Sequence, residues 1–300
     1  MPKLSVVIPT LNCIDLLPGH VASMRGWMSL ADEIIVVDSF SDDGTPEYLK
    51  KHLKHRNVRI LSHPRGLYQS WTFGISQTTG DWVYISTVGD IITLKLLKHL
   101  CEIGESLGCD VVASRPTFIT VNNTPASRQI WPIDHILKSS SSRKPVTLSG
   151  PEAFRFALYS IPCAVLGSSA SNVYRGSHLR ERPFPTEFGT VGDTAWTLRH
   201  GLATRYGFTV EIGSFFRLHP KAYTASEYAV NNLVLKMAEC ALTTLTRDDH
   251  SAQIRADIVR CQLIETAVAL IRKIRSTLPQ AAAQLAQASS TIRSEPLAVS

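Results

Sequence analysis

A run of four β-branched residues followed at once by a polar turn constrains the fold of this chain more than any other feature. The run is Ile34 to Val37, and residues 38–45 then read Asp-Ser-Phe-Ser-Asp-Asp-Gly-Thr. Such a run indicates a strand buried on both faces, and Pro46 suits the first turn of a helix. In open parallel sheets, ligands bind beyond the carboxyl ends of the strands. Asp38 is therefore a candidate ligand-binding residue, with a plain turn cap as the alternative.

The first 115 residues repeat this alternation of strand and helix. We expect strands at 4–8, 34–37, 58–61, 82–85 and 110–113, and helices at 15–28, 46–54, 67–76 and 93–107. Strands that alternate with helices form a mostly parallel sheet with helices on both faces. The sequence thus predicts an α/β fold with a mostly parallel central sheet.

The chain changes character after residue 120. We expect a long polar connection at 121–150, helices at 151–159 and 193–202, a strand at 172–174 and a final pair of strands at 209–212 and 214–218. We therefore divide the chain into a domain at 1–225, with halves at 1–115 and 116–225, a helical extension at 226–279 and a frayed tail at 280–300. We expect the helices of the extension to pack on the first domain or on a second subunit. Their basic end, at 272–275, suggests either contact with a membrane surface or a solvated helix end.

Composition narrows the class of protein. The chain has 300 residues, of which 44% are hydrophobic, and no apolar run is long enough to span a membrane. The six cysteines form no Cys-x-x-Cys pair, so we expect reduced thiols in a cytoplasmic protein and neither disulfides nor a zinc site. The net charge of +6 is spread along the chain. It suits an anionic ligand, and nothing in the sequence is typical of nucleic-acid binding.

Four segments together resemble the family 2 glycosyltransferases, which are inverting enzymes with the GT-A fold. They are residues 4–12, 36–45, 65–75 and 79–83, in the order and spacing of that family. The resemblance implies that the first strand ends hold the nucleotide of a UDP-, GDP- or dTDP-sugar, with Asp38 on an N–H group of the base. The donor-binding residues implied are Pro9, Thr10, Asn12, Asp38, Ser41, Arg65 and Gly66.

The metal-binding segment departs from the family pattern. The family places Asp-x-Asp after the strand at 82–85, whereas this chain has Thr87 and Gly89 there and keeps only the carboxylate of Asp90. A divalent cation, Mg²⁺ or Mn²⁺, offsets the charge of the diphosphate in such enzymes. One carboxylate is a poor site for a hard cation, so a helix cap is the alternative role for Asp90.

Residues 217–219 resemble the Arg-x-His element that follows the last strand in many members. The resemblance implies that His219 is a second metal or diphosphate ligand, since a neutral imidazole can bind a divalent metal. Arg217 would contact the diphosphate or the acceptor. A surface histidine before Pro220 is the alternative for His219.

Residues 188–196 resemble the segment that carries the catalytic aspartate of the family. Inverting transfer needs one base to accept the proton of the acceptor hydroxyl, and Asp193 is the candidate. A helix N-cap is its other possible role, and both can hold together. Trp196 would either contact a sugar or pack in the core.

Together these residues predict an inverting glycosyltransferase that serves polysaccharide or glycoconjugate biosynthesis, with a glycan or a lipid-linked acceptor. A relative that binds nucleotide or glycan without turnover is the first alternative, because the metal segment is incomplete. A nicotinamide oxidoreductase would need Gly-x-Gly-x-x-Gly after the first strand, where this chain has residues 9–12, Pro-Thr-Leu-Asn. A nucleotidyltransferase would need a Gly-rich basic loop at the same place.

Overall fold

The structure is a computed structural model that describes residues 2–127, 130–138, 144–160, 163–218, 256 and 259–260. The chain divides into two compact units, Met1–Thr246 and Arg247–Ser300. Every element named below belongs to the first unit. The predicted helical extension and tail lie outside the described residues, apart from three positions, and so do the membrane or subunit contacts expected of them.

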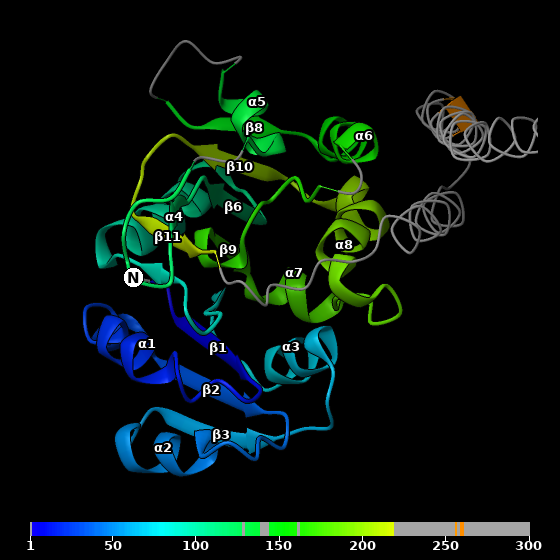
Figure 1. Ribbon diagram of the computed structural model, residues 1–300. Helices are drawn as coiled ribbons and strands as arrows, with labels where there is room; N and C mark the ends of the chain where they lie inside the picture. The colour runs from blue at the N-terminus through cyan, green and yellow to red at the C-terminus, as the bar shows by residue number, and fades with distance from the viewer. Residues whose placement is uncertain are drawn as a thin grey trace, which may run out of the picture. The chain divides into compact units, whose positions relative to one another are not determined.

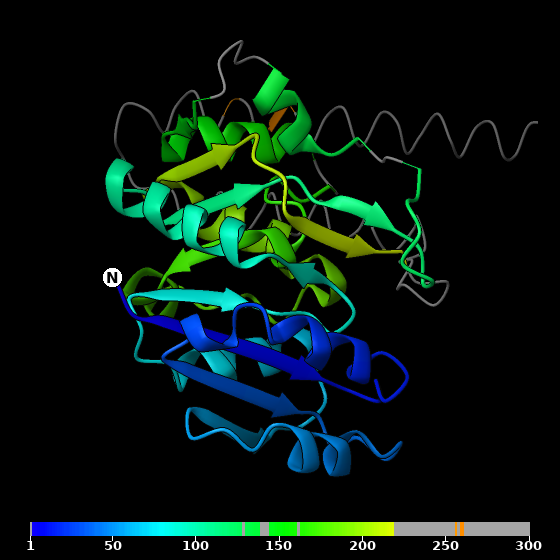
Figure 2. The same ribbon diagram turned by 90° about the vertical axis from the view of Figure 1, so that its left-hand side faces the viewer.

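The first unit contains two sheets (Figures 1 and 2). The large sheet has the order β3-β2-β1-β4-β9-β6-β10-β8 and the small sheet the order β5-β11-β7. The strands are β1 Leu4–Thr10, β2 Glu33–Asp38, β3 Val58–Ser62, β4 Trp82–Ile85, β5 Ile91–Ile92, β6 Val111–Ser114, β7 Thr117–Ile119, β8 Val146–Leu148, β9 Asn172–Arg175, β10 Tyr206–Thr209 and β11 Ser214–Arg217. The helices are α1 Leu17–Met24, α2 Thr45–His52, α3 Leu67–Ser76, α4 Leu94–Leu107, α5 Pro132–Lys138, α6 Gly150–Ser160, α7 Gly176–Glu181 and α8 Gly192–His200.

The large sheet is parallel except where β9 and β8 join it. β3, β2, β1 and β4 run parallel to their neighbours, and so do β6 and β10. β9 is antiparallel to both β4 and β6, and β8 is antiparallel to β10. The predicted α/β fold with a mostly parallel central sheet is therefore confirmed. β1, β2 and β4 end at the same edge of the sheet, where their loops meet (Figure 2).

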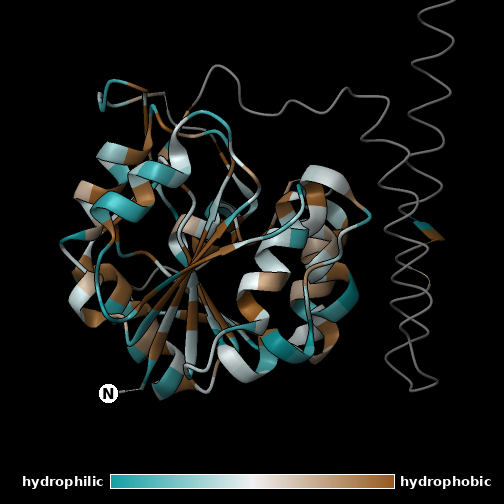
Figure 3. Ribbon diagram, turned by 90° about the horizontal axis from the view of Figure 1, so that it is seen from below, coloured by the Kyte–Doolittle hydropathy of each residue, from teal (hydrophilic) through white to brown (hydrophobic). Residues whose placement is uncertain are grey.

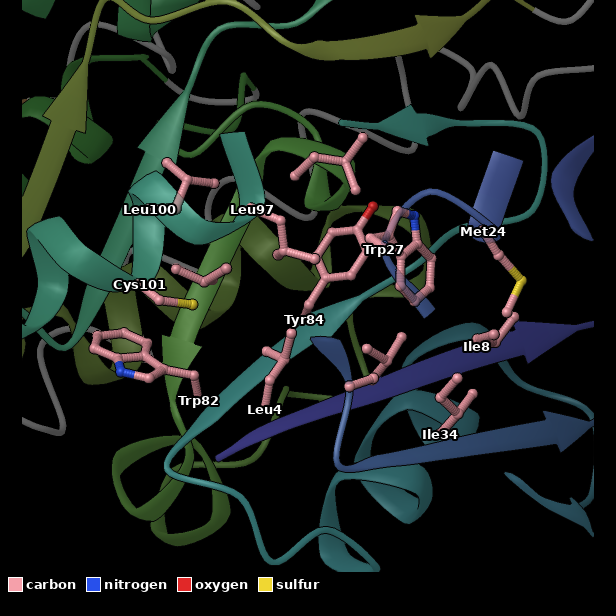
Figure 4. Packing of buried hydrophobic residues seen from close by; sticks show 14 of the residues in the cluster. Leu4, Ile8, Met24, Trp27, Ile34, Trp82, Tyr84, Leu97, Leu100 and Cys101 are labelled. Atoms are coloured by element: carbon pink, nitrogen blue, oxygen red, sulfur yellow. The ribbon is translucent and has the colours of Figure 1, made fainter. Parts of the chain in front are cut away.

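Helices cover both faces of the large sheet, which Figure 3 shows edge-on, looking across the strands. Alternate side chains of a strand point to opposite faces. On one face, strand residues such as Ile8 and Tyr84 pack with Met24 of α1, Trp27, and Leu97 of α4 (Figure 4). Trp27 and Tyr84 meet edge to face with ring centroids 5.9 Å apart.

On the other face, α3 lies directly against β1 and β2. A Cβ atom at Gly74 of α3 would lie only 2.5 Å from Cγ1 of Val7. The glycine therefore permits the close approach of helix and sheet. Since α3 is fixed to the strands that end beside the candidate site, its first turn is held at that edge.

Three predictions about elements are corrected by the structure. Residues 121–150 contain α5 and β8, so they are not simply a loop; both elements are too short for a clear periodic pattern. The predicted helix at 15–28 is α1 followed by a separate 3-10 turn, Met28–Leu30. The predicted strand at 209–212 is wrong, because the strand there, β10, spans Tyr206–Thr209, and the final strands do not pair, because β10 lies in the large sheet and β11 in the small one. Among the helices that the structure describes, none combines the length and the hydropathy needed to cross a bilayer.

Candidate active site

A pocket of about 520 Å³ opens where β1, β2 and β4 end. Its walls come from these strand ends, from the start of α3 and from the segment before α8. The lining residues are Pro9, Thr10, Leu11, Cys13, Ser39, Arg65, Gly66, Leu67, Gln69, Ser70, Thr87, Val88, Thr186, Gly189 and Thr190. Of the predicted site residues, the structure brings Pro9, Thr10, Arg65, Gly66 and Thr87 together here.

The other predicted donor residues form a network directly behind the pocket wall. Oδ1 of Asp38 accepts hydrogen bonds from Thr10 Oγ1 at 2.9 Å and from Ser41 Oγ at 2.7 Å, while Oδ2 accepts one from Ser41 N at 2.9 Å. The backbone N–H of Asn12 donates to Ser41 Oγ at 2.9 Å, and Asn12 Oδ1 accepts from Asp42 N at 3.0 Å. The loops after β1 and β2 are thus tied together. Asp38 is only 4% exposed, and its carboxylate accepts the hydrogen bonds that join the two loops.

Asp90 lies at the end of the loop after β4 and is buried. Its Oδ1 accepts a hydrogen bond from the backbone N–H of Arg217 at 2.9 Å, and Ser168 Oγ lies 3.5 Å from Oδ2. Burial raises the pKa of Asp90 to about 7, although the hydrogen bond and charge of Arg217 act in the opposite direction. The predicted alternative, that Asp90 caps the next helix, is wrong, because Thr93 accepts the capping hydrogen bond from Leu96 N.

A buried histidine supports the same loop. His20 Nδ1 lies 3.2 Å from the backbone oxygen of Asp90, and its Nε2 lies 3.2 Å from Ser86 Oγ. Burial lowers the pKa of His20 to about 4, so the ring is neutral near pH 7. A carbonyl oxygen can only accept, so Nδ1 carries the proton and Ser86 donates to Nε2.

The guanidinium group of Arg217 binds acceptors of the protein itself. Nε donates to the carbonyl of Gly89 at 2.8 Å, and Nη1 donates to the carbonyls of Thr120 and Val121 at 3.0 and 2.9 Å. Nη2 donates to Asn123 Oδ1 at 2.7 Å. These bonds account for the position of Arg217 without a ligand, so its contact with diphosphate or acceptor stays a prediction. His219 lies outside the described residues.

Asp193 lies in the first turn of α8, partly buried. Its Oδ1 accepts a hydrogen bond from Thr194 N at 2.8 Å. Burial raises the pKa of Asp193 to about 6, while hydrogen bonds from the Thr194 backbone and the Tyr68 hydroxyl act in the opposite direction. The residue at the N-cap position is Val191, so the predicted N-cap role of Asp193 is wrong. Thr190, three residues earlier, lines the pocket.

Trp196 packs in the core. Its side chain is 0% exposed, its Nε1 donates to the carbonyl of Arg182 at 2.6 Å, and its ring meets that of Tyr174 edge to face at 5.8 Å. A sugar cannot reach a ring that is buried to this extent. Of the two predicted roles, the core role is confirmed and the sugar contact is wrong.

Residues 5–161, just over half of the chain, match the family described as Glycosyl transferase family 2. The chain belongs to this family. It is 27% identical over 116 residues to a "PGL/p-HBAD biosynthesis glycosyltransferase" of Mycobacterium bovis (strain BCG / Pasteur 1173P2) and equally to one of Mycobacterium tuberculosis (strain ATCC 25177 / H37Ra). Those matches cover 37% of this chain, and the chain spans 45% of the length of each curated relative.

Solved structures of glycosyltransferases share the fold. S. aureus TarS 1-349 in complex with UDP-GlcNAc has a TM-score of 0.64 at 17% identity, covering 86% of this chain and 72% of TarS. The mannosyltransferase PcManGT from Pyrobaculum calidifontis, in complex with GDP-Man and Mn²⁺, has a TM-score of 0.61 at 17% identity, covering 98% of this chain and 81% of PcManGT. At this identity the likeness extends to the fold, and it confirms the predicted GT-A architecture.

The described residues of this family 2 glycosyltransferase do not complete the metal site predicted around Asp90. Within the described part of the chain, no three His, Cys, Asp or Glu side chains lie close enough together to hold a metal ion. Asp90 is buried, and Oδ1 already accepts from the backbone of Arg217. The described residues therefore do not fit a divalent cation by themselves.

Sequence reasoning missed the residues that link the pocket at the strand ends to the segment before Asp193. Ser39 Oγ and Ser70 Oγ lie 2.8 Å apart on the β2 side, and Tyr68 OH on the other side donates to the carbonyl of Thr190 at 3.4 Å. Arg65 and Gly66 were predicted site residues and directly precede α3. The same sequence pattern could therefore have identified the first residues of that helix as site residues. The approach of Thr190 to Tyr68, at a separation of 122 residues, had no local signal.

Proposed function

We propose that this chain transfers a glycosyl group from a nucleotide sugar to an acceptor hydroxyl with inversion at the anomeric carbon. One observation carries the proposal. A single pocket joins the ends of β1, β2 and β4 to the segment that leads into Asp193. A donor bound at the strand ends would thus place its sugar beside a candidate base.

The donor half of the proposal rests on the pocket walls. A volume of about 520 Å³ suits a nucleotide-sized ligand. Thr10 on the wall, with Asp38 and Ser41 in the network behind it, would provide oxygen atoms for a base or ribose, and Arg65 on the wall offers a positive charge for the diphosphate. UDP-, GDP- and dTDP-sugars are the donor classes we propose. The TarS and PcManGT complexes contain UDP-GlcNAc and GDP-Man respectively.

Asp193 is the proposed general base. The acceptor oxygen forms a bond to the anomeric carbon, the bond from that carbon to the diphosphate oxygen breaks, and the hydroxyl proton passes to the Asp193 carboxylate. A single displacement of this kind needs no covalent nucleophile. With its pKa raised to about 6, Asp193 is mostly ionised at pH 7 yet more basic than an ordinary aspartate.

A divalent cation would offset the charge that develops on the leaving diphosphate. Because the described residues provide only Asp90, we propose that Arg65 and the backbone N–H groups at the start of α3 meet much of that charge. A cation held by Asp90 and His219 would then add to the rate without being essential.

The acceptor class is a glycan or a lipid-linked saccharide, in keeping with the biosynthetic glycosyltransferases of Mycobacterium that this chain resembles. A nucleotide-binding relative without turnover is the second candidate function. It is favoured by the incomplete metal segment, in which Gly89 replaces an acidic residue and the backbone of Arg217 binds Asp90.

Release of nucleoside diphosphate from a panel of donors separates the two functions. The panel is UDP-glucose, UDP-GlcNAc, GDP-mannose and a dTDP-sugar, each with and without EDTA, with a mixture of simple glycosides as acceptors. We expect release from at least one donor, and NMR of the product should give the opposite anomeric configuration. Calorimetric binding of a nucleotide without any release would favour the non-catalytic relative.

A further inference from the structure

The acceptor half of the chain carries a cluster of three aromatic rings. They belong to Phe118 of β7, Phe216 of β11 and Trp131, which directly precedes α5. The ring of Trp131 meets those of Phe118 and Phe216 edge to face, with centroids 4.9 and 5.3 Å away. Phe118 is buried, whereas Trp131 and Phe216 are half-buried. Two rings of the cluster thus keep part of their surface open.

Trp131 differs from the other tryptophans of the chain. All five lie in the part of the chain that the structure describes, and Trp131 is the one that is not buried. The other four are at most 6% exposed: Trp27, Trp71, Trp82 and Trp196. Trp131 is nevertheless held in place, because its backbone N–H donates to Asp134 Oδ2 at 3.0 Å and its ring packs in the cluster. A ring fixed in this way loses little conformational entropy when it binds a ligand.

The cluster and the side chain of Arg217 lie on opposite faces of the small sheet. Alternate side chains of a strand point to opposite faces, so Phe216 points away from Phe215 and Arg217. Those two neighbours line a hollow of about 300 Å³ with Gly19 of α1. Phe216 and the rest of the cluster therefore occupy the other face.

On that other face, residues 167–169 connect the cluster to the candidate pocket. The indole lies against Gly167, where a Cβ atom would be only 2.7 Å from Cε3 of Trp131. Two residues later, Ser169 Oγ lies 2.7 Å from Thr87 Oγ1. Thr87 lines the pocket at the strand ends. The partly open indole is thus close to the wall of the pocket in which we place the transfer.

We propose that Trp131, flanked by Phe216, stacks against a pyranose ring of the acceptor and so holds the acceptor hydroxyl beside the pocket. The inference rests on the proposed function, in which the acceptor is a glycan or a lipid-linked saccharide. One face of a pyranose ring presents C–H groups, which the negative face of an aromatic ring attracts. The rim of the sugar carries hydroxyl groups. The half-buried hydroxyls of Ser169 and Thr87 offer them hydrogen-bond partners, which a hydrocarbon chain could not use.

Saccharide binding is measurable without turnover. Because Trp131 is the half-buried tryptophan, the intrinsic fluorescence of the protein should respond to a ligand that covers it. The probes are the methyl glycosides of glucose, galactose, mannose and N-acetylglucosamine, each with saturating UDP or GDP. We expect at least one glycoside to shift the emission and to reduce quenching by acrylamide. Saturation-transfer NMR with irradiation of the aromatic protons should then reach the C–H groups of that glycoside.

Trp131→Leu tests the flat ring, since it keeps an apolar side chain in the cluster but removes the aromatic face. Ile130→Ala is the matched control, because it removes an exposed apolar side chain from the preceding position. We expect Trp131→Leu to raise the acceptor KM and the Kd of the glycoside roughly 10-fold through lost contact area, with donor affinity retained. Trp131→Phe keeps a smaller ring and should lose less, and it serves also if the leucine variant fails to fold. Ile130→Ala should match wild type.

Glycoside affinity that is the same in wild type, Trp131→Leu and Trp131→Phe would overturn the inference, as would an emission that no glycoside changes. Octanol is the probe for a lipid chain, and a response to octanol but not to glycosides would also overturn it. Failure of the proposed function gives a different result. If no nucleotide sugar is consumed while glycosides still bind at Trp131, the transfer is wrong. If transfer occurs and Trp131→Leu keeps its acceptor KM, only the role of Trp131 is wrong.

Discussion

At the scale of single residues, the carboxylate of Asp38 joins the loops that follow β1 and β2, behind the pocket wall. It accepts hydrogen bonds from Thr10 and Ser41, so its removal should loosen the pocket wall as well as remove the contact to the nucleotide that we propose. Charge-assisted hydrogen bonds of this kind contribute about 1–3 kcal/mol each.

We therefore predict that Asp38→Ala weakens the binding of UDP, GDP or dTDP by about 1–3 kcal/mol in calorimetry. Asp42→Ala is the matched control, because it removes the same charge from an exposed side chain in the same loop. Circular dichroism should report a folded protein for both. Equal affinities in Asp38→Ala and wild type would exclude Asp38 from the donor site.

Asp90 allows a prediction about the metal. Asp90→Asn keeps an oxygen for the N–H of Arg217 and can donate to Ser168, so the fold should be retained. If protein groups meet most of the diphosphate charge, exhaustive chelation should lower turnover by less than about 10-fold, and Asp90→Asn should lower any remaining metal effect. Tight Mn²⁺ binding that survives Asp90→Asn would place the metal elsewhere.

At the scale of elements, α4 packs closely against the sheet at Gly104, a residue that has no side chain. A Cβ atom at Gly104 would lie 2.1 Å from Cη2 of Trp82, a buried residue of β4. Gly104→Ala should therefore destabilise the fold by about 1–3 kcal/mol in urea unfolding, despite the better helix propensity of alanine.

Gly19 of α1 offers the opposite case for comparison. It is exposed, and a Cβ atom there would meet nothing within 4 Å. Gly19→Ala should stabilise the protein by about 0.5–1 kcal/mol. If Gly104→Ala and Gly19→Ala both stabilise the protein, the contact between α4 and Trp82 is looser than the distance implies.

The local sequence pattern correctly predicted the helices and strands that are long or strongly apolar. The predicted helix at 67–76 is α3 itself, and the predicted strand at 82–85 is β4. The antiparallel insertion of β9 between β4 and β6 had no local signal, because strand order depends on contacts between distant segments. α5 and β8 were missed because each is short.

The candidate site was predictable to a similar extent. Strand ends identified Pro9, Thr10 and Asp38, because parallel strands bring their carboxyl ends together. The sequence allowed Trp196 either to contact a sugar or to pack in the core, and its complete burial shows that it packs in the core. The contacts of Tyr68 with Thr190 and Gly192 were not predicted, since they depend on how α3 meets the segment before α8.

At the scale of the whole molecule, the proposed base costs folding free energy. Burial raises the pKa of Asp193 to about 6 in the folded protein, from an ordinary value of 3.8. The folded state therefore binds more protons than the unfolded state between these values, and stability from this group falls as pH rises from about 4 to 6. Above pH 6 the folded protein carries the full cost of a buried charge.

Asp193→Asn should consequently be more stable than wild type at pH 7.5, by on the order of 1 kcal/mol, and should lose that advantage at pH 4. Urea unfolding at the two pH values measures the difference. The same ionisation predicts that turnover falls as pH decreases through about 6, because the protonated carboxyl group cannot accept a proton. An advantage that is equal at both pH values would mean that Asp193 is not the titrating group.

The most direct test of the proposed reaction is the turnover number of Asp193→Asn measured beside its affinity for the donor. Glu187→Gln is the control, since it alters an acidic side chain of the same segment that pairs with Arg199 at the surface. We predict that Asp193→Asn binds the donor normally and loses about 10²–10⁴-fold in turnover, while Glu187→Gln keeps both. Turnover near the wild-type value in Asp193→Asn would contradict the assignment of the base and, with it, the placement of the acceptor.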